Sequence, residues 1–192
     1  MTYPSVPEET RLQSFSMVPI TVQSNAQGAS CVVAIGAGNQ QYLTPQPSVP
    51  NSLWYLAIKC TTLEAAYNQS SADTSNVPNG LTPYLTSDYI LCVVSSGLSS
   101  NNVPQGALFD LLIANGAGSE LRRLAQVNNQ LGCAELHHVS YILLTQAGND
   151  LPGLEESSIL QNEGIAAVLT AQLLPIVIDG QPVYTPVELG NA

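Results

Sequence analysis

The sequence predicts an α+β fold whose strands form a mostly antiparallel sheet. Strand-like apolar segments open the chain, two helical segments follow in the middle, and further strand-like segments close it. Strands and helices grouped in this way, in place of alternating along the chain, indicate antiparallel pairing. The chain has 192 residues, which fits one α+β domain at residues 17–192. Residues 1–16 are polar, contain prolines and show no periodicity, so they predict an extended N-terminal arm.

Short apolar runs bounded by turn residues predict the strands. In residues 53–62 one alternating set of side chains is apolar and should face the core, namely Trp54, Leu56, Ile58 and Cys60. Residues 42–52 contain prolines and residues 68–82 are polar, so both are predicted as loops. The strands predicted before the last segment are residues 17–23, 30–35, 53–62, 88–95 and 139–146.

Two helices are predicted in the middle of the chain. The first follows Pro104 and carries leucines three and four residues apart. Asn115-Gly116 provides the left-handed stop that commonly ends a helix. The second runs from Ser119, a favourable N-cap residue, to Leu131.

The last segment predicts a C-terminal β-hairpin. Residues 165–178 form a long apolar stretch that Pro175 is expected to break. Asp179-Gly180 then supplies a tight turn between two strand-like runs.

The composition argues against nucleic acid and membranes as partners. The net charge is −10, and four cations are too few to neutralise a phosphate backbone or an anionic membrane. No apolar run reaches the roughly 18 residues that span a bilayer, and the first residues lack the pattern of a signal peptide. Charged residues make up only 9% of the chain. Its surface is therefore expected to be neutral and polar, as in many secreted and virion proteins. The cations are Arg11, Lys59, Arg122 and Arg123.

A succession of motifs covers residues 53–148. An apolar strand at residues 89–96 precedes a helix at residues 108–118, and a second strand at residues 139–144 is followed by Gly148. This succession resembles the interleukin-like EMT inducer, or PANDER-like, domain family. The resemblance implies two mostly antiparallel β-sheets in a sandwich-like arrangement, flanked by two or three short helices. It also implies non-enzymatic roles, in signalling or in carbohydrate binding.

The chain departs from the family pattern at three places. Gly97 stands where the family has an aspartate, and residues 119–138 read as an insertion. The cysteines do not fall at the family's positions, so no disulfide pairing carries over. They are predicted as buried free thiols, although two disulfides remain an alternative. The cysteines are Cys31, Cys60, Cys92 and Cys133.

Two glycine motifs resemble phosphate-binding loops. Gly36-Ala37-Gly38 follows an apolar run, but a dinucleotide fingerprint needs a third small residue and a helix. Gln41 occupies that third position and the prolines after it forbid the helix, so a turn at a strand end is predicted. Gly116-Ala117-Gly118 has two interpretations: caps for the two helices, or an anion site at the start of the second helix.

The sequence predicts no catalytic residues, metal ligands or cofactor. His137 and His138 have Cys133 and Glu135 nearby, but no second ligand pair follows at zinc-site spacing. Packed or surface histidines are therefore predicted. There is no GxSxG motif for a serine nucleophile. Two adjacent acidic pairs lie in predicted loops and are expected to be solvated, namely Glu8-Glu9 and Glu155-Glu156.

These observations predict a non-enzymatic structural or interaction protein in a virion or other extracellular assembly. An accessory subunit of a phage tail or capsid is the leading hypothesis, with an arm held by a neighbouring copy in a homo-oligomer. The alternative is a carbohydrate-binding module that recognises host or surface glycans. Tyr42 and Tyr84, in predicted loops, are then the candidate sugar-stacking residues, whereas Trp54 is assigned to the core.

Overall fold

The computed structural model describes residues 15–25, 30–46, 48–131, 137–161 and 166–189. Most of the predicted N-terminal arm lies outside these residues. The described elements in the first half are β1 (Val18–Gln23), β2 (Val32–Ile35), β3 (Gln40–Leu43), β4 (Ser52–Lys59), β5 (Ala65–Ser71), η1 (Thr82–Tyr84), β6 (Tyr89–Ser96), β7 (Leu98–Ser99) and η2 (Ser100–Asn102). The others are α1 (Gly106–Ala114), α2 (Ser119–Leu131), β8 (His137–Gln146), β9 (Leu154–Gln161), β10 (Val168–Ile178) and β11 (Gln181–Glu188).

The strands form two sheets. The first sheet has the order β11-β10-β1-β2-β3, and every neighbouring pair in it is antiparallel. The second sheet has the order β5-β4-β6-β8-β7, with β9 on the free side of β8. Its neighbouring strands are also antiparallel. The prediction of antiparallel sheets is therefore confirmed.

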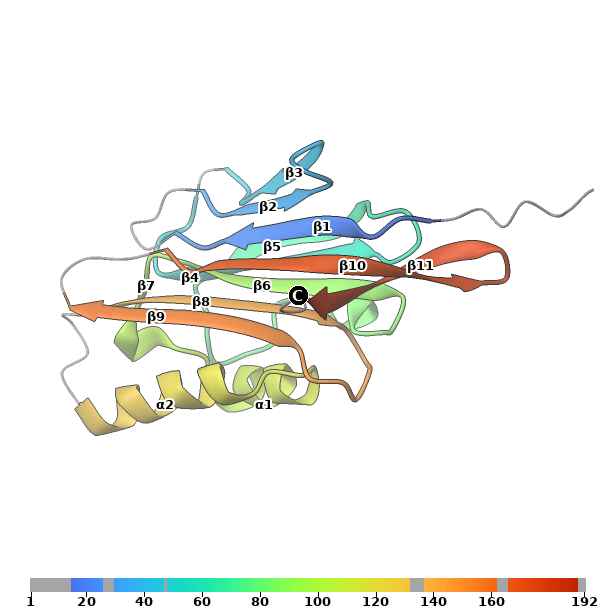
Figure 1. Ribbon diagram of the computed structural model, residues 1–192. Helices are drawn as coiled ribbons and strands as arrows, with labels where there is room; N and C mark the ends of the chain where they lie inside the picture. The colour runs from blue at the N-terminus through green and yellow to red at the C-terminus, as the bar shows by residue number, and fades with distance from the viewer. Residues whose placement is uncertain (1–14, 26–29, 47, 132–136, 162–165, 190–192) are drawn as a thin grey trace, which may run out of the picture.

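The described elements form three layers (Figure 1). One face of the first sheet packs against the second sheet, and this core contains Ile20 and Val33 from one sheet with Trp54 and Ile142 from the other. The opposite face of the second sheet packs against α1 and α2. The helices contribute Leu108, Leu112, Leu121 and Leu124 to this second core. Both α-helices thus cover the same face of the same sheet.

Strand β4 has both faces buried, which differs from the prediction. Trp54 and its alternating neighbours face the first sheet, as expected from their apolar character. The other set, which includes Leu53 and Tyr55, is also buried, because it faces the helix layer. A central strand between two cores needs apolar side chains on both faces.

Four strands lie in segments that had no strand prediction, and one of them is the two-residue strand β7 at Leu98–Ser99. β3 occupies the start of the predicted loop at residues 42–52, and β5 extends into the loop predicted at residues 68–82. β9 contains Glu155-Glu156, which was also placed in a loop. β3, β5 and β9 are polar edge strands, so their pairing comes from a neighbouring strand and not from an apolar pattern of their own.

The glycines of residues 36–38 form a turn inside a hairpin. Gly36, Ala37 and Gly38 all have positive φ, and the chain turns back directly into β3, which pairs with β2. The prediction of a glycine turn is confirmed. The prediction that the chain leaves this turn into a proline-rich loop is wrong, because β3 comes first.

Pro175 does not break β10, contrary to the prediction. The backbone N–H of Tyr184, the residue opposite Pro175, donates to the carbonyl of Cys60 at 3.0 Å, away from β10. At this pair the polar backbone groups of both strands therefore point outward, and a proline there removes no bond between β10 and β11. The hairpin predicted from Asp179-Gly180 forms around two residues with positive φ.

Candidate functional site

The main candidate is the face of the first sheet that points away from the second sheet, here called the outer face. In β1, β2 and β10 buried side chains alternate with exposed or half-buried ones, and the buried set lies in the inter-sheet core. The register of the strand pairs places the second set together on the opposite face. This outer face consists of Pro19, Thr21, Gln23, Val32, Ala34, Gln41, Leu43, Val168, Thr170 and Gln172. At the edge of this face, Val168 and Thr170 also line a pocket of about 350 Å³ with Glu155, Glu156 and Glu188.

No residue of the outer face carries a charge. Among the described charged residues, only Asp179 and Glu188 lie in the first sheet, and both belong to the β10–β11 hairpin. The others lie in the second sheet, the helices and the loops that join them. A protein with a net charge of −10 thus keeps one broad sheet face neutral. Depletion of charged residues is the compositional mark of protein interfaces.

The end of the β10–β11 hairpin, here called the ribbon tip, carries a further group of exposed apolar residues. The pairing of β1 with β10 stops at Val18–Leu173, so the residues beyond have no strand beside them on that edge. Ile176, Val177 and Ile178 are 49%, 55% and 53% exposed. Figure 1 shows the hairpin reaching past the neighbouring strands on the right of the view. Consecutive exposed apolar residues of this kind mark contact surfaces.

Prolines protect both edges of the ribbon tip against strand pairing. Pro182 and Pro186 lie two residues to either side of Tyr184, so their missing N–H groups fall on the outward edge of β11. Pro175 likewise leaves the outward edge of β10 without an N–H donor at its position. An edge that lacks N–H donors is a poor template for a further strand. Contacts at the ribbon tip must therefore involve its side chains.

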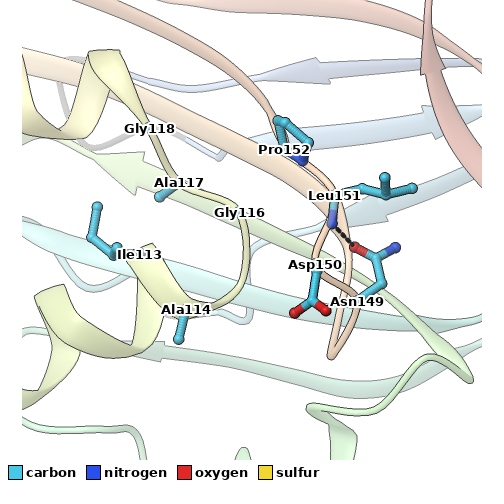
Figure 2. A pocket seen from close by; sticks show the side chains of 9 residues that line it. All are labelled: Ile113, Ala114, Gly116, Ala117, Gly118, Asn149, Asp150, Leu151 and Pro152. Atoms are coloured by element: carbon cyan, nitrogen blue, oxygen red, sulfur yellow. Dashed lines mark hydrogen bonds between the residues drawn. The ribbon is translucent and has the colours of Figure 1, made fainter.

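A second candidate is a pocket of about 370 Å³ between the α1–α2 junction and the loop that joins β8 to β9 (Figure 2). Gly116 lies so close to this loop that a Cβ atom would sit 2.6 Å from the Gly153 nitrogen. Two polar side chains, Asn149 and Asp150, line the pocket, and Asn149 accepts a bond from the Leu151 N–H at 3.0 Å. The remaining lining is small or apolar and offers little to fix a ligand. Its other residues are Ile113, Ala114, Ala117, Gly118 and Pro152.

The anion at the start of α2 belongs to the chain itself. The carboxylate of Glu155 in β9 accepts the backbone N–H groups of Gly118 at 2.7 Å, Glu120 at 3.2 Å and Leu121 at 3.3 Å. These are the donors that an external anion would use at a helix N-terminus. The interpretation of this motif as an anion site is thus wrong, and so is the prediction that Glu155 is solvated.

Neighbouring polar groups extend this cap. The Tyr141 hydroxyl donates to Glu155 at 2.7 Å, and burial, followed by the nearby Glu155 charge, raises the pKa of Tyr141 well above its ordinary value. Arg123 donates to Glu120 at 2.7 Å and to the Ser157 hydroxyl at 2.6 Å. The hydrogen bond from Ser157, more than the charge of Arg123, lowers the pKa of Glu120. The network fastens α2 to β9.

The structure separates Tyr42 from Tyr84. Tyr42 lies in β3 and packs on the inter-sheet core, while its hydroxyl donates to the Leu63 carbonyl at 2.7 Å and accepts the Ala65 N–H at 3.0 Å. Tyr84 ends η1 and packs against the core on the helix side of the second sheet. The two tyrosines therefore lie on opposite sides of the second sheet and do not form one site. The prediction that they lie in loops is wrong for Tyr42.

The described cysteines are free and buried, which confirms that prediction for Cys31, Cys60 and Cys92. Burial raises their thiol pKa values to about 11, about 12 and about 12 respectively, so all three are protonated at neutral pH. Cys133 lies outside the described residues.

Within the described residues, no three histidine, cysteine, aspartate or glutamate side chains gather to hold a metal ion. His138 is exposed at the start of β8. The side chain of His137, and all of Cys133 and Glu135, lie outside the described part of the chain.

Sequence reasoning missed the outer face, although the sequence carries a signal for it. There is no charged residue between Arg11 and Lys59, and none between Glu163 and Asp179. These two neutral stretches supply β1, β2, β3 and β10, which make the outer face. Only the strand pairing shows that they share one surface.

Comparison with protein-family models finds none that matches the chain, and comparison with curated proteins finds no significant relative. Among the described helices, none is long and apolar enough to cross a membrane.

Proposed function

We propose that this chain is a non-enzymatic interaction protein, a subunit of a larger assembly that docks through its outer face. The proposal rests on one observation: the side chains of the outer face are uncharged, and they are exposed or half-buried. In a sheet with one solvated face, each strand usually alternates buried apolar residues with exposed polar ones, and some of the exposed residues are charged. Here exposed positions such as Leu43 and Val168 are apolar, and the polar ones are Thr and Gln.

The surroundings of the described nucleophiles and acids support this reading over an enzymatic one. The buried thiols are protonated, with pKa values raised by burial away from the range of a reactive cysteine. The carboxylates of Glu155 and Glu120 are engaged in fastening α2 to β9. These hydrogen bonds support the fold, and Glu155 also lines, with Glu156 and Glu188, a pocket of about 350 Å³ between β9 and β10.

We further propose an accessory position in a virion, such as a phage tail or capsid decoration. The neutral polar composition supports it, since charged residues are only 9% of the chain. We also propose a sandwich-like domain of the interleukin-like EMT inducer type. Two antiparallel sheets that share one core, with helices on the far side of one sheet, support that assignment.

Cysteine labelling tests whether the outer face is covered in the native assembly. Thr170→Cys places a thiol on the outer face, and Ala66→Cys places one on exposed β5 as the matched control. Both are made in a Cys133→Ser background. In extracts of the source cells or particles, the thiol at position 170 should resist maleimide while that at position 66 reacts. Equal, rapid labelling at both positions would contradict the proposal.

Carbohydrate binding is the second candidate, and an aromatic cluster favours it at Tyr84. The Tyr84 ring lies 5.5 Å from that of Tyr67 and 5.2 Å from that of Tyr89, and it is half-buried. A glycan array tests it: Tyr84→Ala should abolish binding, whereas Tyr42→Phe, which alters a hydroxyl bonded to the backbone, should not. An array without any bound glycan would remove this candidate.

A further inference from the structure

We infer that Asn79 is a site of spontaneous covalent modification, at which the asparagine side chain converts to aspartate and isoaspartate. An asparagine followed by glycine is prone to this reaction, because glycine has no side chain to shield its backbone nitrogen. The chain contains this dipeptide twice, at Asn79-Gly80 and at Asn115-Gly116. The structure distinguishes the two sites, since only the first leaves both reacting groups unbonded and exposed.

The reaction needs only the chain itself and water. The Gly80 backbone nitrogen attacks the side-chain carbonyl carbon of Asn79, and the new C–N bond closes a cyclic imide. The side-chain nitrogen of Asn79 leaves as ammonia and takes the proton of the Gly80 N–H. Water then opens the imide at either carbonyl carbon, which gives aspartate or isoaspartate. At neutral pH each product adds a negative charge to a chain whose net charge is −10.

Both reacting groups of the first dipeptide are accessible. Asn79 and Gly80 are exposed, in a turn where the Leu81 N–H donates to the Pro78 carbonyl at 3.2 Å. Within the part of the chain that the structure describes, neither the Asn79 side-chain amide nor the Gly80 N–H makes a hydrogen bond. A Cβ atom at Gly80 would have only the Tyr67 ring within 4 Å, at 3.8 Å. An exposed turn with so few contacts opens at a small cost in free energy.

The same dipeptide at Asn115-Gly116 is buried and hydrogen-bonded. The Asn115 side-chain nitrogen donates to the Leu111 carbonyl at 2.9 Å, and its oxygen accepts the Gly148 N–H at 3.1 Å. The nitrogen that would attack, that of Gly116, donates to the Ile113 carbonyl at 3.2 Å. Imide formation would have to break these bonds and open the close contact between Gly116 and the β8–β9 loop. The fold therefore protects this second site.

The modification alters the aromatic cluster around Tyr84. The Asn79 carbonyl accepts the Tyr67 hydroxyl at 3.0 Å, and the Tyr67 ring lies 5.5 Å from the Tyr84 ring. In isoaspartate the main chain runs through the side-chain carbons, so this carbonyl is no longer part of a peptide bond. The hydrogen bond that holds Tyr67 is then lost or rearranged. The surface around Tyr84 therefore changes with the age of the protein.

Peptide mass mapping of the purified full chain after incubation at neutral pH tests the inference. Chymotrypsin, which cleaves after tyrosines such as Tyr84, places Asn79 and Asn115 in separate peptides. The mass gain from replacing NH2 by OH should appear at Asn79 at least ~10-fold faster than at Asn115, because a protected site reacts only after local unfolding. The rate at Asn79 should rise with pH, since the attacking nitrogen must lose its proton.

The unfolded chain is the matched control. In concentrated urea both dipeptides lose their surroundings, so the rates at Asn79 and Asn115 should become similar. Asn79→Gln keeps the amide on a longer side chain that closes the ring poorly. This variant should lose the modification at position 79 and keep the wild-type circular dichroism, because the position is exposed. Equal rates at the two sites in the folded chain, or a difference that persists unchanged in urea, would overturn the inference.

Discussion

Two sheet faces of this protein point away from the inter-sheet core, and they are completed in different ways. The face of the second sheet is covered by α1 and α2, which bury leucines toward the sheet and expose charged residues such as Asp110 and Arg122 to water. Among the residues that the structure describes, no helix covers the outer face of the first sheet (Figure 1) and no charged residue belongs to it. The chain's own helices therefore cover the face of the second sheet. We propose that the cover for the other face comes from a second molecule.

The largest effect is expected on the covered side, at Gly116. A Cβ there would meet the backbone of Gly153 at 2.6 Å and of Leu151 at 2.8 Å, and φ is +93°. Gly116→Ala should therefore lower the free energy of unfolding by about 3 kcal/mol or more. Urea denaturation measures it. Gly180→Ala is the control, because it also has positive φ but no atom within 4 Å, and it should cost about 1 kcal/mol. Equal losses would mean that packing at Gly116 is looser than described.

A smaller loss is expected when the cap of α2 is removed. Glu155→Ala leaves three backbone N–H groups and the Tyr141 hydroxyl without their acceptor, which should cost about 2–3 kcal/mol. Glu156→Ala, its exposed neighbour in β9, should change stability by less than about 0.5 kcal/mol. If both variants unfold at the same urea concentration, Glu155 does not hold the helix.

Acid should remove the contribution of Glu120. Because its folded-state pKa is lowered below the ordinary 4.5, its stabilisation is complete above that pH and is lost as pH falls through the folded-state pKa. Glu120→Gln should cost about 0.5 kcal/mol at neutral pH, since the group is partly exposed. The difference between wild type and variant should vanish in strong acid. A difference that stays constant with pH would contradict the assignment.

The smallest effect on folding is expected on the outer face. At low protein concentration Thr170→Lys should change the free energy of unfolding by less than about 0.5 kcal/mol, because position 170 is exposed in the single chain. Urea denaturation at low protein concentration measures this change. A large loss at low concentration would show that this face already contributes to the monomer.

Central strands and both helices were predictable from the sequence, because their patterns are local. β4, β6 and β8 are continuous apolar runs, and α1 and α2 carry leucines at helical spacing. The missed strands β3, β5 and β9 are edge strands with polar sequences, such as QQYL in β3. Their conformation is decided by the strand beside them, which local propensity does not report.

The candidate site was less predictable than the fold. The neutral stretches that form the outer face are visible in the sequence, but only the register of β10 with β1 brings Thr170 beside Thr21. The actual cap of α2 could not be found from the local sequence. Ser119 is a residue type that commonly caps a helix, whereas the acceptor of the first N–H groups is Glu155 in β9. Long-range contacts of this kind depend on tertiary structure.

The Glu155 cap also has a consequence for the order in which the chain matures. During synthesis α2 is complete before β9 exists, because its capping carboxylate lies 37 residues beyond Gly118. Until β9 docks, the first turn of the helix must leave its N–H groups to water, and a short helix on its own is marginally stable. The helix layer therefore reaches its final stability late. A nascent chain that ends before residue 155 would carry a frayed α2.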